Sequence, residues 1–388
     1  MKKNNILFVH PIKEFSGSLK SMEEYLKLHK KKFNLFFLVP RGIASKRLEK
    51  YGVVIKVHGL VKFDNSQLGY YRGLRWILIL RELFLIFPTF FAAYSIKKKI
   101  KHIDLIHFNE ITLIPTIYIF KLFFSVPFIL HCRILFKKNN YFGKKIIRFI
   151  KNNVNQIIAI DNDVKNSFPK YLNIKIIRNI FLPQGRKKYK RYFRNKFLNI
   201  GYIGSFLKYK GLEDLIKVFN KLNSQNYKIR LYLAGNFLKS HKIFELFKLS
   251  NNIDKNLIKS KNIIYMGHIN KIDNFYNKID VLCFPSYLNA LGRQTFEAAF
   301  YKVPSIVCLK NNKSDSFINN KTGLAFKIAG SKKQLEQKIK FYLLNKKYVI
   351  KMGLNAKKLI SKNYDINMNY NNLLNIYFKN IKNFKALK

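Results

Sequence analysis

The sequence has few cysteines and no metal-binding motif. Of its 388 residues only Cys132, Cys283 and Cys308 are cysteines, widely spaced and without a CxxC pair. Each lies in an apolar run, which favours buried free thiols in a reducing compartment over a disulfide framework. We therefore expect neither structural disulfides nor a bound metal ion.

Uninterrupted apolar runs long enough to cross a membrane are also scarce. Residues 76–96 have the length but contain Arg81 and Glu82, and residues 113–130 contain Lys121. Because a charged side chain at the bilayer centre costs about 2.5–3.5 kcal/mol on insertion scales, we predict that both runs are core elements of a soluble domain. The N-terminal apolar run is short and lacks a small-residue cleavage site, so no export signal is expected.

Acidic residues are strongly under-represented. The chain has 20 Asp and Glu against 74 Lys and Arg, a formal net charge of +54, and such a surface attracts polyanions or anionic lipid. A solvated lysine-rich surface without a specific partner is the alternative. A nucleic-acid-binding protein would show stacking aromatics on a basic face, an RNP-like run or a recognition helix. The sequence shows none of these, so we predict no nucleic-acid partner.

What the sequence does contain is a regular alternation of apolar and amphipathic segments, over a length that suits two domains. Continuously apolar strands joined by helices are typical of a parallel sheet covered on both faces, so the predicted fold class is α/β. The predicted strands are residues 5–10, 33–39, 53–57, 104–108, 127–131 and 156–160, then 197–204, 229–235, 262–267, 280–285 and 304–309.

The boundary between the two halves is predicted in residues 186–196, which are strongly basic and contain no acid. We interpret this segment as a linker; a phosphate-attracting segment at the mouth of a cleft is the alternative. The domains are then residues 1–185 and 197–362, and residues 363–388 form a C-terminal helix expected to pack back on the first domain. Open parallel sheets bind ligands at the carboxyl ends of their strands.

The first motif with chemical meaning is "GYIGSFLKYKGLEDLI", which begins at Gly201. Gly201 and Gly204 allow close backbone approach where the strand turns, and Lys210-Gly211 opens a helix whose free N–H groups suit a phosphate. Lys210 would add a point charge against a diphosphate. By itself the pattern also describes an ordinary strand–helix turn.

The second motif is "SYLNALGRQTFEAAF", residues 286–300. Asn289–Gly292 follows a predicted strand, so its main-chain N–H groups can meet phosphate or sugar oxygens. Glu297 lies one turn inside the next helix, where it can accept two hydroxyls, as from a ribose. A carboxylate that merely stabilises the first turn of the helix is the alternative.

Two further candidates lie in the first half. The turn Ser16-Gly17-Ser18 enters a helix, and Gly17 would let a diphosphate or sugar approach the backbone, whereas a plain helix N-cap is the alternative. In "FILHCRI", His131 and Arg133 stand where a strand ends. A lone histidine there is more often structural.

Together these motifs resemble a known family. The segments "GYIGSF…KGLEDLI", "LYLAG", "IIYMGHIN…FYNKIDVLCFPS", "NALGRQTFEAAFYKVPSIV" and "NNKTGLAF" look like the second domain of the retaining glycosyltransferases of family 4, which have the GT-B fold. "DLIHFN" and "IIAIDNDVKNSF…IKIIRNIF" resemble their first domain. The resemblance implies two Rossmann-like domains facing each other across a cleft. It also implies metal-independent transfer, with retention, from a UDP-, GDP- or ADP-sugar.

The resemblance also assigns roles to residues. Lys210 matches the lysine that neutralises the donor diphosphate, and Gly17 matches the glycine turn near that diphosphate. Glu297 matches the second glutamate of the E-x7-E motif, which contacts the ribose. His131 matches a histidine near the transferred sugar. The expected catalytic residues are His131, Lys210, Asn289 and Glu297. The expected donor-binding residues are Gly17, Ser205, Lys210, Gly267, Ala290, Leu291, Gly292, Arg293 and Glu297.

Three positions depart from the family pattern. Asn289 replaces the first glutamate of E-x7-E, Ser205 stands where an arginine is common, and Lys302 stands where a glycine usually precedes the next strand. Because an amide still binds sugar hydroxyls, we interpret Asn289 as a shifted sugar preference. A non-catalytic protein that binds nucleotide or polyanion is the alternative.

Two segments indicate where the acceptor binds. Residues 72–101 combine basic residues with Phe84, Phe87, Phe90 and Phe91, and residues 135–152 alternate lysines with aromatic and aliphatic residues. Such helices suit an anionic membrane surface, although a core face with a solvated lysine face is the alternative. We predict a cytoplasmic, peripheral enzyme that extends a lipid-linked or oligosaccharide acceptor in bacterial surface-polysaccharide synthesis.

Overall fold

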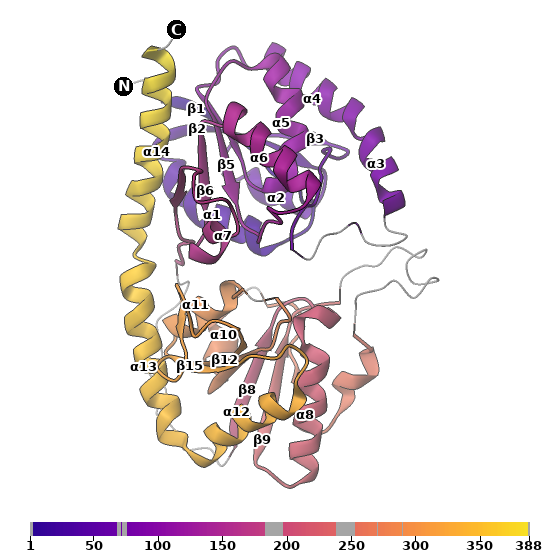
Figure 1. The fold of residues 1–388 in the computed structure, drawn as a ribbon, viewed down its shortest axis with the longest axis vertical. Coiled ribbons are helices and arrows are strands. Elements are labelled where there is room, and N and C mark those ends of the chain that lie inside the picture. The colour runs from indigo at the N-terminus through magenta and orange to yellow at the C-terminus, as the bar shows by residue number, and fades with distance from the viewer. Residues whose placement is uncertain are drawn as a thin grey trace. The chain divides into compact units, whose positions relative to one another are not determined.

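The fold consists of two compact α/β units, each built on a parallel sheet (Figure 1). Unit 1 comprises Met1–Phe181 and Tyr364–Lys388, and unit 2 comprises Leu182–Asn363. The predicted α/β class is confirmed. The computed structural model describes residues 3–67, 71, 76–182, 197–237, 253–269, 271–288 and 290–386. The predicted linker 186–196 and Asn289 lie outside these ranges.

Unit 1 contains a seven-stranded sheet in the order β3-β2-β1-β4-β5-β6-β7, with all neighbours parallel. Every strand predicted in the first half is present. The sheet order reverses direction at β1, which pairs with β2 on one side and β4 on the other. The strands are β1 (Asn4–Val9), β2 (Phe33–Pro40), β3 (Val53–Val57), β4 (Leu105–Phe108), β5 (Phe128–Cys132), β6 (Gln156–Ala159) and β7 (Ile174–Ile176).

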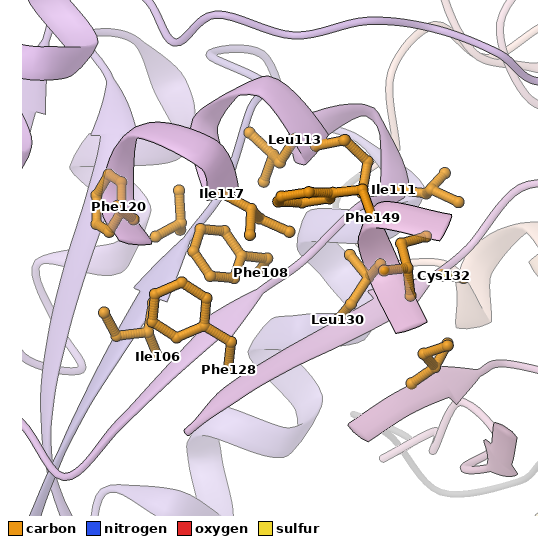
Figure 2. Packing of buried hydrophobic residues seen from close by; sticks show 14 of the residues in the cluster. Ile106, Phe108, Ile111, Leu113, Ile117, Phe120, Phe128, Leu130, Cys132 and Phe149 are labelled. Carbon is orange, nitrogen blue, oxygen red and sulfur yellow. The ribbon is translucent and has the colours of Figure 1, made fainter. Parts of the chain in front are cut away.

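One face of this sheet is covered by helices from the middle of unit 1. Figure 2 shows Phe108 and Phe128 of the strands packed with Phe120 of a covering helix. The ring of Phe108 lies 5.7 Å from that of Phe120 and 5.2 Å from that of Phe128, between centroids. These helices are α4 (Ile86–Lys99), η2 (Ile111–Leu113), α5 (Ile114–Phe123), α6 (Tyr141–Asn153) and α7 (Asn162–Asn166). Helix α3 (Leu78–Phe84) precedes α4, and Glu82 is its one buried residue.

The opposite face is covered by α1 (Gly17–His29), α2 (Ile43–Leu48) and the last helix, α14 (Ile366–Ala386). Helix α14 reaches this face through Tyr370, Leu373, Leu374 and Tyr377, whose spacing places them on one side of a helix. The Tyr377 hydroxyl lies 2.6 Å from Nδ1 of the buried His107 on β4. The C-terminal helix is therefore part of the core of unit 1.

Unit 2 contains a six-stranded parallel sheet in the order β10-β9-β8-β11-β12-β15 and a small hairpin. The sheet order reverses at β8, as it does at β1 in unit 1. The strands are β8 (Leu198–Ile203), β9 (Ile229–Ala234), β10 (Ile263–Tyr265), β11 (Val281–Phe284), β12 (Ser305–Cys308), β13 (Lys313–Ser314), β14 (Phe317–Ile318) and β15 (Gly323–Phe326). The helical segments are η3 (Lys208–Lys210), α8 (Leu212–Ser224), η4 (Lys255–Lys259), α10 (Asp273–Tyr276), α11 (Arg293–Phe300), α12 (Lys332–Leu344) and α13 (Lys346–Asn363).

The prediction that residues 76–96 form a core element holds only for the inner face of α4, where Thr89, Ala92, Ala93 and Ile96 are buried. By length and composition alone Leu78–Lys99 could cross a membrane, and only 28% of its most apolar window is buried. The second run is confirmed as core, since α5 and β5 contribute Ile117, Phe120 and Phe128 to the interior. The aromatic face of α3 and α4 consists of the exposed residues Ile77, Leu80, Leu83, Phe84, Phe87, Phe90, Phe91 and Tyr94.

One buried histidine makes the stability of unit 1 depend on pH. His29 is fully buried among rings that include Phe33, Tyr370 and Tyr377, and neither of its ring nitrogens has a hydrogen-bond partner in the described part of the chain. Burial lowers the pKa of His29 from 6.5 to about 3. The unfolded chain therefore binds a proton that the folded chain does not, and stability is lost as the pH falls from 6.5 towards 3.

We expect the free energy of unfolding of unit 1 to fall as the pH is lowered from 6.5 to 4. The substitution His29→Phe should reduce this slope by up to about 1.4 kcal/mol per pH unit. The single tryptophan, Trp76, lies in unit 1 and reports its unfolding by fluorescence in urea. The matched control is His58→Phe, at an exposed position. Equal slopes in the wild type and His29→Phe would contradict the prediction.

Candidate functional site

In unit 2 the carboxyl edge of the sheet is built from glycine backbone. Gly204, Gly235 and Gly267 follow β8, β9 and β10 with φ of 152°, 138° and 63°, values that favour glycine. A methyl group on Gly235 would lie 1.8 Å from the carbonyl oxygen of Gly204, so these two turns pack directly against each other. The edge therefore presents main-chain groups rather than side chains.

Lys210 lies at the same edge. Lys210 is the last residue of η3, and the following Gly211 adopts φ 73°. The Cα of Gly211 packs against the carbonyl of Pro285, the residue that follows β11. The ammonium Nζ stands 5.6 Å from the ring centroid of Phe284 and 5.3 Å from that of Tyr209. Burial lowers the pKa of Lys210 to about 8. Within the described ranges no carboxylate forms an ion pair with it, so its charge is available to an anion.

Glu297 is held in place by two neighbours. Its Oε1 accepts a hydrogen bond of 2.6 Å from Nε of Arg293, one helical turn earlier, and its Oε2 accepts one of 3.2 Å from the Tyr276 hydroxyl. Glu297 is 3% exposed. Burial and the nearby Glu297 charge raise the pKa of Tyr276 well above its usual value. Arg293 and Tyr276 therefore hold the Glu297 carboxylate in one orientation.

The remaining predicted residues of unit 2 surround the start of α11. Gly292 is the N-cap of this helix and Arg293 its first residue. Ala290 and Leu291 are half-buried just before it. Ser205 follows β8, and its carbonyl accepts a hydrogen bond of 2.9 Å from the Tyr202 hydroxyl. Ser205, Lys210 and Gly292 thus lie at the adjacent ends of β8 and β11.

Sequence reasoning missed two residues of this half-site. Tyr276 supports Glu297 from α10, a contact between distant segments that no local pattern shows. Gln294 places its side chain beside both Gly204 and Gly292, and its Oε1 is buried without a hydrogen-bond partner among the described residues. A buried acceptor without a donor is rare, so Gln294 is a candidate for direct contact with a bound hydroxyl.

In unit 1 a buried polar cluster lies at the carboxyl ends of β1, β4 and β5. Arg133 donates hydrogen bonds of 3.0 Å to the side-chain oxygens of Asn109 and Asn179. Its Nη2 lies 3.4 Å from Nδ1 of His131, and the Asn109 amide lies 3.0 Å from Nδ1 of His10. The structure therefore connects the predicted His131 with Arg133 and with His10.

The electrostatics of this cluster favour neutral imidazoles beside a fixed cation. Burial and the charge of Arg133 lower the pKa of both His10 and His131. The Nε2 atoms of both histidines are buried and unpartnered within the described chain. Burial raises the pKa of Glu110 to about 7, and this carboxyl accepts the N–H of Ile111 at 2.9 Å. Such a set can bind hydroxyls and exchange a proton near neutral pH.

Gly17 is the first residue of α1. The N-terminus of this helix has a side-chain cap, as the alternative of a plain helix N-cap predicted. Ser16 is the N-cap, and its hydroxyl accepts the N–H of Leu19 at 3.2 Å. A methyl group on Gly17 would meet nothing within 4 Å. The backbone of Gly17 is therefore open to approach, although the turn also has an ordinary structural role.

The comparisons with known proteins find a family match in unit 2. Residues 185–359, which lie within this unit, match the family described as glycosyl transferases group 1. The chain is 25% identical over 195 residues to the Staphylococcus aureus capsular polysaccharide biosynthesis glycosyltransferase CapM, covering 49% of this chain and 48% of the relative. It thus matches about half the length of that relative.

Solved glycosyltransferase structures share the fold of nearly the whole chain. Anabaena Alr3699/HepE in complex with UDP-glucose matches with a TM-score of 0.72 at 15% identity, over 97% of this chain and 99% of that one. A glycosyltransferase from Rickettsia africae gives 0.70 at 19% identity, over 99% and 100%. A variant of S. aureus TarM gives 0.67 at 13% identity, over 96% and 99%. With the two parallel sheets, these likenesses confirm the GT-B fold class.

The departure at Lys302 has a cost that the structure explains. Lys302 follows α11 with φ 59°, a left-handed conformation that costs a non-glycine residue roughly 1–2 kcal/mol. We expect Lys302→Gly to raise the free energy of unfolding of unit 2 by about 1 kcal/mol. Hydrogen exchange of the α11 amides measures this effect directly.

The matched control is Lys278→Gly, an exposed turn lysine that lacks a positive φ. This substitution should lower stability, because glycine only adds freedom to the unfolded chain there. Faster exchange in Lys302→Gly than in the wild type would show that the left-handed turn is not the dominant effect.

Proposed function

We propose that this chain is a retaining glycosyltransferase of family 4 that transfers a hexosyl group from a nucleotide-diphosphate sugar to a lipid-linked or oligosaccharide acceptor. The observation that carries the proposal is Lys210. It is a cation with a lowered pKa that no described carboxylate neutralises, at a glycine-lined strand edge within the region that matches glycosyl transferases group 1. The likeness to a capsular polysaccharide glycosyltransferase supports a role in surface-polysaccharide synthesis.

The donor is bound by unit 2 in this proposal. Lys210 faces the diphosphate, and the N–H groups at the start of α11 and the backbone of Gly204 and Gly292 approach its oxygens. Glu297 accepts the ribose hydroxyls, because a carboxylate has lone pairs beyond those used by Arg293 and Tyr276. Structures of Alr3699/HepE with UDP-glucose and of TarM with UDP support a UDP-sugar as donor.

Transfer then depends on stabilising the leaving group. As the glycosidic bond to the diphosphate breaks, negative charge builds on the phosphate oxygens, where preorganised donors are most effective. Lys210 and the α11 N-terminus supply that stabilisation without requiring a metal ion. The acceptor hydroxyl attacks from the face of the departing diphosphate, which takes the hydroxyl proton, so the anomeric configuration is retained.

Donor binding is tested by thermal shift with UDP-, GDP- and ADP-sugars. A nucleotide sugar at 100 times its Kd should stabilise the protein by about 2.7 kcal/mol. Lys210→Ala should abolish the shift because the diphosphate loses its cation, whereas the neighbouring exposed Lys208→Ala should keep it. The affinity of the wild type should fall as the pH rises through 8, since Lys210 then loses its proton.

Three outcomes are informative. A shift with one nucleotide that is lost only in Lys210→Ala identifies the donor class. A shift without detectable sugar transfer supports the non-catalytic alternative. A shift that Lys210→Ala retains in full would contradict the assigned role of Lys210.

We further propose that unit 1 docks on an anionic membrane through the aromatic face of α3 and α4. Phe84 is 75% exposed and Phe87 is 67% exposed, more apolar surface than soluble proteins usually leave open. Within residues 76–101 the only acid is Glu82, which is buried and accepts the N–H of Lys62, whereas Lys97–Lys99 end the helix. Amphipathic surfaces of this kind bind anionic bilayers.

The substitution set Phe84→Ser, Phe87→Ser and Phe91→Ser should abolish flotation of the protein with anionic vesicles at moderate salt, because it removes the inserted rings. The control set Leu344→Ser, Leu354→Ser and Phe378→Ser removes three exposed apolar residues from other helices and should keep flotation. Equal loss in both sets would argue against docking by this face.

A further inference from the structure

The lysine face of α6 borders a concave surface that the donor site does not use. In α6 the apolar residues Ile146, Ile147 and Phe149 are buried, so the alternative of a core face with solvated lysines holds for this helix. Beside it lies an open hollow of about 570 Å³. We call it the α6 hollow; its lining is Lys138, Asn139, Lys144, Ile147, Arg148, Lys151, Pro169 and Tyr171.

Positive charge is concentrated in the α6 hollow without compensation. Lys144, Arg148 and Lys151 follow one another at spacings of four and three residues, which places them on one side of the helix. Like charges at this spacing repel each other and destabilise a helix. No residue that lines the hollow is acidic. A bound anion would offset this repulsion.

The fourth cation of the hollow is held in position by the backbone. Lys138 is half-buried and its Nζ donates to the carbonyl oxygens of Asn166 and Phe168, at 3.2 and 3.3 Å. Asn166 ends α7 and Phe168 follows it, so the ammonium is fixed at the end of this helix. Arg148 adds a planar fork that matches two oxygens of one phosphate.

The remaining lining favours an organic phosphate over a bare ion. Ile147 and Pro169 are apolar, and Tyr171 exposes 70% of its surface with a ring that can cover an attached group. The volume lies in the range of small-molecule sites, about 300–1,000 Å³. Helix α6 belongs to the same layer as α5, since the rings of Tyr118 and Phe149 stack at 3.7 Å, and α5 packs on α4 of the aromatic face.

We propose that the α6 hollow is a binding site for a phosphate-bearing group, a phosphate monoester or diphosphate, separate from the donor site of unit 2. A lipid headgroup and a soluble phosphate compound share this chemistry. The site itself does not depend on the proposed transferase activity; only a lipid source would connect it to membrane docking.

The first experiment measures the affinity for inorganic pyrophosphate by calorimetry, in a Lys210→Ala background that removes the donor cation. The triple substitution Lys144→Gln, Arg148→Gln and Lys151→Gln should weaken the Kd at least tenfold. The control Lys30→Gln, Lys31→Gln and Lys46→Gln removes the same charge from the turn after α1 and from α2, elements that cover the other face of the sheet. It should change the Kd less than twofold.

The second experiment identifies the source. The retention of the protein is compared on phosphatidic acid and phosphatidylglycerol vesicles of matched surface charge. Stronger retention on phosphatidic acid that is lost only in the α6 triple variant assigns a lipid phosphate. Equal retention combined with pyrophosphate binding assigns a soluble phosphate compound. Equal weakening of pyrophosphate binding by both triple variants, or no binding by any, overturns the site. The nucleotide-sugar thermal shift of the α6 triple variant, with Lys210 intact, reports separately on the donor site.

Discussion

Parallel pairing of the strands determines where chemistry can occur in each unit. All carboxyl ends of a parallel sheet lie along one edge, so loops far apart in sequence meet there. In unit 2 this constraint brings the turn after β8 against the residues after β11, where Gly211 touches Pro285. In unit 1 it brings His10, Asn109 and Arg133 from three strands into one hydrogen-bonded cluster. Each half-site is therefore assembled from segments that are separate in the sequence.

The scarcity of acids gives each buried carboxylate a structural task. Glu23 accepts from Arg47 at 2.7 Å and also meets Lys50, which ties α1 to α2. Glu297 pairs with Arg293. The chain has few carboxylates, and these are already paired with other residues. Lys210 and the lysine face of α6 are therefore left without acidic partners among the residues described. The molecule thus keeps its positive charge available at specific places rather than only over its surface.

The strands and the glycine edge were predictable because their signals are local. Continuous apolar runs predict buried parallel strands, and Gly204 and Gly211 indicate turns that need unusual φ. The exposure of much of residues 76–96 was not predictable, because composition and periodicity do not distinguish a core helix from one that leaves an apolar face exposed. The support of Glu297 by Tyr276 was not predictable either, since it joins α10 to α11 through tertiary packing. The site roles of His131 and Lys210 stay predictions.

The route of the chain has a consequence for biosynthesis. Helix α14 covers one face of the unit 1 sheet, yet it is made only after the whole of unit 2. A nascent chain therefore carries a first sheet on which His29 and Phe33 lack their contacts with Tyr370 and Tyr377 until these residues emerge. Domains generally fold in order of synthesis, but here the unit begun first is finished last. The growing protein must keep that apolar face from aggregating while its second unit folds.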